Sequence, residues 1–418
     1  MQKIITYSLL LLSLILLITP VSKQINAFLL QSVPSLLVPV EKASIHTTTT
    51  TLSAITASLP TAEAPDGLYA TAYCLLDGSN GRVLFEKEGD KKLPMASTTK
   101  IMTCILALEY GNLSDTVTVS AYAASMPDVQ LNMREGDTFI LKDLLYSLML
   151  ESHNDTAVAI AEHIGGTVEG FAKLMNEKAA DLGLTSTHFV TPNGLDAEEH
   201  YTTAKELALL ASYAITNEDF IAITNTPSYT FSEQSSGKSY SVHNHNAFLT
   251  MYEGAIGVKT GFTNNAGYCF VGAVKSGKKT FVSSVLACGW PPHKTYKWSD
   301  TTRLMNYGVH GFQKEKITPS DVTLPKLSVT SGVGSDVSLK LADDSLFRLL
   351  LTGTDTVSYT LKLSNSLCAP VREGDIVGEL SYYVNDELYT SIPVITADSV
   401  SSVSYTYFLE KLLIAFFS

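Results

Sequence analysis

An apolar run that follows directly on a short polar stretch constrains this chain more than any other feature. Residues 101–108, Ile-Met-Thr-Cys-Ile-Leu-Ala-Leu, carry no charged side chain and are predicted to form a buried helix. The stretch 94–100, Pro-Met-Ala-Ser-Thr-Thr-Lys, leads into it. Ser97 is therefore expected at or just inside the helix N-terminus. Lys100 follows three residues later, on the same face of the first turn.

This pair suits nucleophilic catalysis under one condition. A serine hydroxyl is a poor nucleophile until a nearby group takes its proton. A lysine amine can take that proton only when its pKa is lowered, which needs burial or a second cation. Backbone N–H groups at a helix N-terminus would then stabilise an oxyanion. Taken alone, Ser97 and Lys100 favour the simpler interpretation of an N-capped helix with a solvated lysine, but two later motifs change that.

A second polar motif separates two apolar helices. Residues 138–150 are predicted to be helical from their apolar spacing, and the next helix begins at Asp155. Ser152 and Asn154 lie between the two helices, where an apolar junction normally excludes polar side chains. In an extended loop they would point the same way and His153 the other way. The alternative is a capping turn, in which Ser152 or Asn154 caps the second helix.

A third motif lies on a predicted strand. Residues 254–261 read as a strand that ends in Lys259, Thr260 and Gly261. A glycine at this point allows another backbone to approach closely. Thr260 and the N–H group that follows Gly261 can then pair with a substrate laid along the strand.

The remaining patterns predict two domains. The predicted elements of the first domain are a hairpin within residues 67–86, helices at 168–182, 203–215 and 294–307, a turn at 191–196, and a hairpin formed by 266–274 and 280–288. We expect the first strands to join the last in one sheet of an α/β domain over residues 66–313. Residues 314–397, rich in Val, Thr, Ser and Asp with short alternating runs, are predicted to form a small all-β domain.

The N-terminus has the pattern of an export signal. Lys3 precedes an apolar run over residues 4–21, and Lys23 follows it. This pattern is typical of a secretory signal peptide or an uncleaved N-terminal anchor over residues 1–27. Because the run is short for a membrane span, we favour export with cleavage.

Two further segments are predicted to lie outside the globular domains. Residues 28–65 contain a run of threonines and are predicted to be a flexible linker. Residues 398–418 are predicted to contain an amphipathic helix, Tyr405 to Phe417, that lies in a membrane interface. The alternative is a terminal helix packed on the all-β domain.

Composition excludes several classes of function. The formal net charge of −12 argues against binding to nucleic acid or another polyanion. The five cysteines have no CxxC spacing and apolar neighbours, which favours buried thiols over disulfides. There is no zinc-binding pattern, and His243 and His245 alone do not indicate a metal site. These patterns therefore give no indication of a metal site.

The three motifs together resemble a known family. Ser-x-x-Lys at 97–100, Ser-x-Asn at 152–154 and Lys-Thr-Gly at 259–261 are, in this order, the signature of penicillin-binding proteins and class A β-lactamases. The chain is most similar to the low-molecular-mass penicillin-binding proteins, which are serine-type D-Ala-D-Ala carboxypeptidases (peptidase S11-like). The stretches 96–103, 193–196 and 257–263 support this, and the resemblance covers residues 66–397. One position departs from the family pattern, because His153 stands where the family usually has glycine between Ser and Asn. This difference bears on access past the loop and on substrate choice.

The resemblance implies a penicillin-binding/β-lactamase-like transpeptidase fold, α+β with a helical block and an antiparallel sheet, and then a small all-β domain. It implies that Ser97 attacks the penultimate D-Ala carbonyl of a peptidoglycan stem pentapeptide and that Lys100 takes the serine proton. Ser152 would relay a proton to the leaving D-Ala, and Asn154 would position Lys100 and the substrate amide. Water would then hydrolyse the acyl-enzyme, and the resemblance implies that neither a metal nor an organic cofactor is required.

The third motif would bind the substrate. The resemblance implies that Lys259 and Thr260 hold the terminal carboxylate. The backbone N–H groups of Ser97 and Phe262, the residue after Gly261, would form the oxyanion hole. β-Lactam antibiotics would acylate the same serine. The resemblance also implies work outside the cytoplasmic membrane, at its outer face and the cell wall, with the C-terminal helix as membrane anchor.

Two alternatives come from other classes of protein. A β-lactamase-like hydrolase shares the three motifs, but a class A enzyme also needs a positioned glutamate, and no Glu-x-x-Leu-Asn occurs in the helical block. A catalytically idle wall-binding protein would not need the motif residues, which are intact here. A vegetative and a sporulation role are both compatible with these residues.

Overall fold

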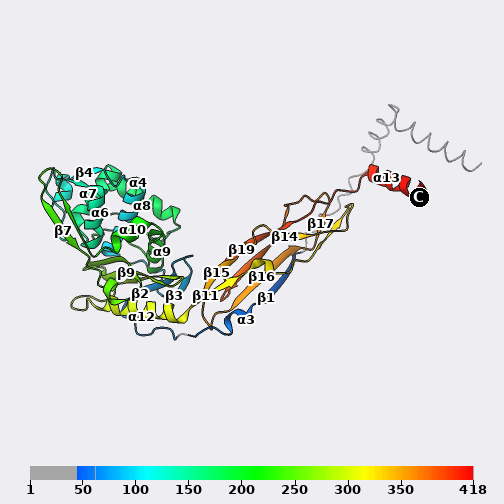
Figure 1. Ribbon diagram of the computed structural model, residues 1–418, viewed down its shortest axis with the longest axis horizontal. Coiled ribbons are helices and arrows are strands. Elements are labelled where there is room, and N and C mark those ends of the chain that lie inside the picture. Colours follow the sequence, from blue (N-terminus) through cyan, green and yellow to red (C-terminus); the bar gives the residue numbers. More distant parts are fainter. Residues whose placement is uncertain (1–44, 62, 418) are drawn as a thin grey trace, which may run out of the picture. The chain divides into compact units, whose positions relative to one another are not determined.

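The computed structural model describes residues 45–417 with the exception of residue 62 (Figure 1). The predicted signal or anchor at residues 1–27 lies outside the described residues. The described chain forms two compact units. The larger unit holds residues 52–318 and 346–357, and the smaller unit holds residues 45–51, 319–345 and 358–417.

The larger unit is built on a five-stranded antiparallel sheet in the order β3-β2-β10-β9-β8. The strands are β2 (Ala72–Asp77), β3 (Val83–Lys87), β8 (Ala255–Thr263), β9 (Gly267–Ser276) and β10 (Lys279–Leu286). The first strands therefore pair with the last, as predicted. Side chains alternate along β2, so that Cys74 and Leu76 join one core cluster and Tyr73 and Leu75 join another.

Helices cover this sheet. Helix α12 (Tyr296–Gly311) packs against the sheet, and its Gly308 lies against Phe281 of β10 and Leu75 of β2. Helix α9 (Ala204–Ala214) begins beside Ser284 of β10, whose hydroxyl donates to the Ala204 carbonyl. The helices predicted at 294–307 and 203–215 are thereby confirmed. A sheet covered by helices buries both faces, which explains why β2 is apolar at nearly every position.

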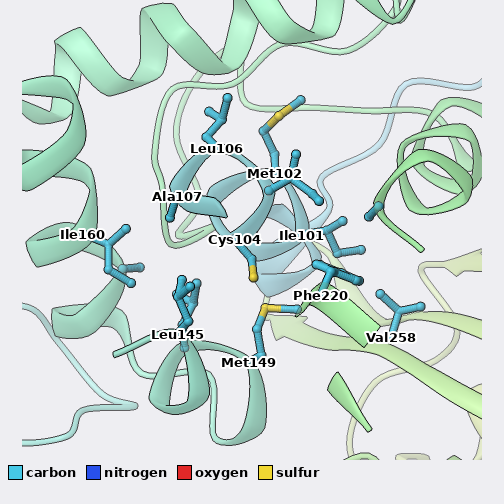
Figure 2. Packing of buried hydrophobic residues seen from close by; sticks show 14 of the residues in the cluster. Ile101, Met102, Cys104, Leu106, Ala107, Leu145, Met149, Ile160, Phe220 and Val258 are labelled. Atoms are coloured by element: carbon cyan, nitrogen blue, oxygen red, sulfur yellow. The ribbon is translucent and has the colours of Figure 1, made fainter. Parts of the chain in front are cut away.

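Helix α4 (Lys100–Tyr110) is the centre of the helical block. Every side chain from Lys100 to Ala107 is buried. Figure 2 shows the helix enclosed by side chains of four other elements. They are Leu145 and Met149 of α6 (Leu141–Leu150), Ile160 of α7 (Asn154–Gly165), Phe220 of α10 (Glu218–Thr224) and Val258 of β8. A helix that is apolar on all sides is a core helix, so the buried helix predicted from residues 101–108 is confirmed.

The other elements of the larger unit frame this block. The helices are α3 (Ser53–Thr56), α5 (Ala121–Ala124), α6 (Leu141–Leu150), α7 (Asn154–Gly165), α8 (Val168–Asp181), α10 (Glu218–Thr224) and α11 (Phe248–Met251), with the 3₁₀ helix η1 (Ala96–Thr99) before α4. Three small antiparallel pairs are β4 (Thr116–Thr118) with β5 (Thr138–Ile140), β6 (Ser228–Ser232) with β7 (Ser239–His243), and β11 (Gln313–Ile317) with β15 (Phe347–Leu351). The last pair places residues 314–318 and 346–357 in the larger unit, beyond the predicted boundary at 313.

The smaller unit is rich in β-structure, as predicted. Its five-stranded sheet has the order β1-β16-β18-β19-β14, and a second sheet has the order β13-β12-β17. The strands are β1 (Ile45–Thr51), β12 (Leu327–Thr330), β13 (Asp336–Val337), β14 (Leu339–Leu341), β16 (Val357–Ser364), β17 (Ser366–Cys368), β18 (Ile376–Val384) and β19 (Glu387–Thr396), with the short 3₁₀ helix η2 (Pro319–Asp321). Alternate residues such as Leu361, Leu380 and Val394 form its core.

The prediction of a flexible linker over residues 28–65 is wrong for residues 45–51. These residues form β1, which pairs with β16 along its whole length, from Ile45 opposite Ser364 to Thr51 opposite Ser358. Threonine is β-branched and suits a strand. The run lacks the polar/apolar alternation that reveals a strand in a sequence, because β1 is an edge strand with mostly exposed side chains.

The C-terminal residues form the predicted helix, α13 (Tyr405–Phe417). None of its residues is buried, and Phe408, Leu412 and Ile414 are each at least 60% exposed. The alternative of a helix packed on the β-rich unit is therefore wrong. No helix in the described part of the chain is both long and apolar enough to cross a membrane.

The cysteines are mostly as predicted. Cys74, Cys104, Cys269 and Cys288 are buried free thiols, and burial raises the pKa of each. Cys368 is also free but exposed, because it lies at the end of the short strand β17.

Candidate active site

Ser97 lies in the one-turn helix η1, which runs straight into α4. Threonine hydroxyls brace this turn: Thr98 Oγ1 donates to the Met95 carbonyl and Thr99 Oγ1 to the Ala96 carbonyl, at 2.5 and 2.8 Å. Ser97 is half-buried, whereas Lys100, the first residue of α4, is fully buried. The serine expected at the helix N-terminus is therefore found there, in a 3₁₀ turn.

Lys100 joins three chain segments. Its Nζ atom lies 3.1 Å from Ser97 Oγ and 2.9 Å from Asn154 Oδ1, and it also donates to the Asn193 carbonyl. These acceptors use all three donors of an ammonium group. In the neutral amine the lone pair can instead accept the Ser97 proton, while the other two contacts keep the nitrogen in place.

The environment of Lys100 favours the neutral amine. Burial lowers its pKa well below the usual lysine value, and the nearby cation of Lys259 lowers it further. Asp155 acts in the opposite direction. Burial and a second cation, either of which can make a lysine a base, are therefore both present.

The loop between α6 and α7 carries the second motif. Asn154 is the first residue of α7; its Oδ1 accepts from Lys100, and its Nδ2 donates to the carbonyls of Pro127 and Asp128, both at 3.1 Å. Ser152 has a left-handed backbone, with φ of 73°. Its Oγ is buried without a hydrogen-bond partner among the described residues.

This arrangement differs from both predictions for the loop. Neither Ser152 nor Asn154 caps α7, because His153 is the N-cap residue and makes no side-chain capping bond. The loop is not extended either, since Ser152 is left-handed. The polar side chains of Ser152 and Asn154 are nevertheless buried at this junction, which a capping turn would not require.

Strand β8 carries the third motif at the edge of the sheet, with no strand described on its outer side. The side chain of Lys259 is buried, and its Nζ donates to the Thr260 carbonyl at 3.1 Å. Burial and the nearby cation of Lys297 lower the pKa of Lys259 to about 7. Phe262, the residue after the Lys-Thr-Gly motif, is 37% exposed.

Gly261 brings β8 against η1. A Cβ atom at Gly261 would lie 3.0 Å from the backbone nitrogen of Ser97 and 3.1 Å from the Ala96 Cβ and the Thr98 nitrogen. Real Cβ contacts are rarely this short. The close approach of another backbone, predicted from a glycine after Lys-Thr, is therefore found, and the approaching backbone is that of Ser97.

Two functional groups were missed in the sequence. The carbonyl of Asn193 accepts from Lys100 and, at 3.4 Å, from Ser97 Oγ. The sequence predicted a turn here, and residues 193–196 supported the family resemblance, but no role in the site was assigned to Asn193. The signal was the Asn-Gly pair: Gly194 has φ of 83°, and a Cβ there would collide with the Ala96 carbonyl.

The second missed group is Lys297 of α12. Its Nζ lies 4.7 Å from the Tyr268 ring centre and 4.9 Å from that of Trp298, and it helps to lower the Lys259 pKa. A lone lysine on a helix gives no signal of this kind. Among the described residues, no group of His, Cys, Asp and Glu could hold a metal ion.

The fold and this site define a serine hydrolase of the penicillin-binding class. Two family profiles match the chain: "D-alanyl-D-alanine carboxypeptidase" (peptidase S11) over residues 59–288, and "Penicillin-binding protein 5, C-terminal domain" over residues 312–402. The chain is 29% identical to the D-alanyl-D-alanine carboxypeptidase DacF of Bacillus subtilis over 349 residues, 82% of this chain and 88% of the relative. It is 31% identical to DacC of Escherichia coli over 359 residues, 81% of this chain and 86% of the relative.

Solved structures agree. Penicillin-binding protein 5 from Haemophilus influenzae matches with a TM-score of 0.66 and 25% identity, covering 82% of this chain and 100% of the neighbour. The chain belongs to the D-alanyl-D-alanine carboxypeptidase family, the S11 serine peptidases. The family, the serine-type enzyme class and the two-part fold inferred from the three motifs are thereby confirmed.

Proposed function

We propose that this enzyme removes the terminal D-Ala from peptidoglycan stem pentapeptides through an acyl-enzyme on Ser97. The observation that carries the proposal is the position of Lys100, whose buried nitrogen lies 3.1 Å from Ser97 Oγ and 2.9 Å from Asn154 Oδ1. A buried amine with a lowered pKa, within hydrogen-bond reach of a hydroxyl, is suited to act as a general base.

In the acylation step Ser97 Oγ attacks the carbonyl carbon of the penultimate D-Ala while Lys100 takes the hydroxyl proton. Asn154 and the Asn193 carbonyl hold the Lys100 nitrogen during this transfer. The resulting oxyanion accepts hydrogen bonds from the backbone N–H groups of Ser97 and Phe262. The close packing of Gly261 on the Ser97 backbone supports this, because it brings β8 and η1 together.

The leaving D-Ala needs a proton on its nitrogen. Ser152 is proposed to relay it from Lys100, since its buried Oγ has no hydrogen-bond partner among the described residues and is free to pair with substrate. The C–N bond then breaks, D-Ala leaves, and water hydrolyses the ester on Ser97. Lys100 is again the base for that water.

The substrate carboxylate is proposed to bind at Lys259 and Thr260. β8 is an edge strand, so a stem peptide can add to it as a further strand. A carboxylate would stabilise the protonated form of Lys259, whose pKa of about 7 leaves the free enzyme partly neutral at neutral pH. Penicillin carries a carboxylate in a comparable position and is proposed to acylate Ser97.

The enzyme is proposed to work outside the cytoplasmic membrane, exported by the N-terminal segment and attached through α13. Exposed Phe408, Leu412 and Ile414 support an apolar contact with lipid. The helix of 13 residues rises only about 20 Å, too little to cross a core of about 30 Å, so it should lie in the interface.

The strand pairing in the smaller unit supports attachment to the membrane at one end of its five-stranded sheet. Ile45 of β1 faces Ser364 at the end of β16. Gly378 of β18 lies against the Lys362 backbone and faces Val394 near the end of β19. The chain therefore enters this sheet at the same end from which the segment leading to α13 leaves. An anchor at either terminus would hold this end at the membrane.

The experiment that tests the proposed function is release of free D-Ala from a pentapeptide by the purified protein. We expect stoichiometric D-Ala and tetrapeptide with the wild type and none with Ser97→Ala. Penicillin should form a long-lived adduct, whereas steady hydrolysis of penicillin without D-Ala release would favour the β-lactamase alternative. A folded wild type that neither releases D-Ala nor binds penicillin would favour the idle wall-binding alternative.

A further inference from the structure

His153, the residue between the two polar residues of the second motif, is buried between α6 and the start of α7. Only 3% of His153 is exposed, and its ring contacts α6 and the residue that precedes Ser152. Nδ1 lies 2.8 Å from Ser147 Oγ in α6, and Nε2 lies 3.2 Å from Glu151 Oε2. The proposed mechanism uses neither His153 nor these two partners.

The partners of His153 determine its tautomer. A carboxylate only accepts hydrogen bonds, so Nε2 carries the proton and donates to Glu151. Nδ1 is then an acceptor, and the Ser147 hydroxyl donates to it. The oxygen of Ser147 accepts in turn from Thr156 of α7, at 2.9 Å. Each member therefore has a defined donor or acceptor role in one chain of hydrogen bonds.

The chain of hydrogen bonds is attached to the framework at both ends. Thr156 and Ser147 are fully buried in α7 and α6. At the other end, Glu151 Oε1 accepts from the backbone N–H of His243 in β7, at 2.7 Å. The loop is thus held to two helices and a strand by the side chains of His153 and Glu151.

These two side chains meet across Ser152. Glu151 precedes Ser152 and His153 follows it, so the contact between their side chains constrains the backbone of Ser152, whose φ is 73°. A serine in the left-handed region is strained, and such a backbone persists only where its surroundings hold it. The contact between Glu151 and His153 holds the Ser152 backbone in this conformation. Ser152 Oγ itself has no hydrogen bond to a described residue.

We infer that His153 is a positioning residue, which holds Ser152 and Asn154 in place for proton transfer with Lys100 through its bonds to Ser147 and Glu151. This inference rests on the proposed function. It also makes the loop sensitive to pH. A protonated ring donates from Nδ1, so the Ser147 hydroxyl must turn from His153 to Thr156 and the donor and acceptor roles along these hydrogen bonds must reverse.

The charged groups around the ring decide when this happens. Burial lowers the His153 pKa, and the positive charges of Lys100 and His245 lower it further, whereas Asp155 and Glu151 raise it. Burial is the largest cause, so the ring is neutral at pH 7 and protonates only in acid. Reversal of the hydrogen bonds of Ser147 should therefore add to the acid-side loss of activity that protonation of Lys100 causes.

The test is the pH profile of acylation by a fluorescent penicillin, with separate fits for the dissociation constant of the non-covalent complex and for the acylation rate constant. His153→Ala should lower the rate constant on the order of a hundredfold and leave the dissociation constant nearly unchanged, because it misplaces catalytic groups. His153→Gln can accept and donate as the ring does but does not titrate. It should acylate near the wild-type rate at neutral pH, with a shallower acid limb.

Two further variants make the test specific. Ser147→Ala should lower the rate constant in the same direction as His153→Ala, and the double variant should be no slower than His153→Ala alone. His163→Ala is the matched control, because His163 also lies in α7 and pairs with a carboxylate, Asp115, at 3.3 Å near the surface. It should change neither the rate nor the profile.

An acid limb in His153→Gln as steep as that of the wild type would overturn the inference, as would additive losses in the double variant or an unchanged rate in His153→Ala. If His153→Ala does not fold, the profile of His153→Gln decides alone. A wild type that penicillin does not label would instead contradict the proposed function, so the two failures are distinguishable.

Discussion

The Lys100 nitrogen, which is fully buried, lies 3.1 Å from the hydroxyl oxygen of the half-buried Ser97. The two residues are one helical turn apart in the chain, and α4 is surrounded by apolar side chains (Figure 2). Burial therefore both fixes the geometry of the pair and lowers the Lys100 pKa. The same packing that stabilises the helix prepares the base.

Lys100→Met should remove the base while filling most of the same volume. Penicillin acylation should fall by on the order of 10²–10⁴-fold, the usual contribution of general base catalysis. Intact-mass analysis should show one adduct on the wild type, mapped to Ser97, and none on Ser97→Ala. Lys173→Ala is the control, since Lys173 is 78% exposed. An adduct that survives Ser97→Ala would contradict the assignment of the nucleophile.

Lys259→Ala should weaken turnover of a substrate with a free terminal carboxylate. A buried charge-assisted contact contributes about 1.5–3 kcal/mol, or on the order of ten- to a hundredfold. Turnover of the corresponding amide should already be poor and should hardly change in the variant. Equal losses on acid and amide would mean that Lys259 acts elsewhere, for example on the pKa of Lys100.

The two lysines predict a bell-shaped pH dependence of kcat/KM. The rate should fall as the pH drops through the Lys100 pKa, because the protonated amine is no base. It should also fall as the pH rises above about 7, because Lys259 then loses the charge that binds the carboxylate. Bound carboxylate stabilises the charged Lys259, so kcat should hold to higher pH than kcat/KM. Persistence of the alkaline limb with the amide substrate would exclude Lys259 as its origin.

Gly261→Ala should slow acylation because its Cβ would lie 3.0 Å from the Ser97 nitrogen, and either β8 or η1 must shift. Displacement by a few tenths of an ångström misaligns the oxyanion donors, and removing one such donor costs on the order of 10²–10³ in rate. Gly334→Ala in the smaller unit is the control, since its Cβ would meet nothing closer than 3.8 Å. Unchanged acylation in Gly261→Ala, measured by stopped flow, would show that the contact is not critical.

Removal of the residues after Ser404 should release the protein from membranes in a chain that already lacks residues 1–27. The cut spares the backbone pairs of Val400 with Val371 and of Ser402 with Gly332, which hold the end of the smaller unit. Because α13 buries none of its side chains, the melting temperature and penicillin acylation should not change. Retention on vesicles after truncation, or loss of the fold, would refute attachment through α13.

The sequence alone determined the elements with strong local signals and the chemistry of the site. The uncharged run after Lys100 specified a core helix, and the order of the three motifs specified the family. Gly261 marked a close backbone contact, because only a residue without Cβ permits one. These inferences depend on residues near one another in the chain or on residue types with few alternative uses.

Only the tertiary structure decided what depends on a distant partner. The threonine run at 47–51 is a strand because β16 offers it an edge, and Asn193 enters the site through its carbonyl, a group that every residue has. The contacts of the His153 ring with Ser147 and Glu151 could not be read from the motif, although its departure from glycine was noted. Backbone groups and buried polar contacts leave no periodic trace in a sequence, because their partners are chosen by the packing of segments far apart in the chain.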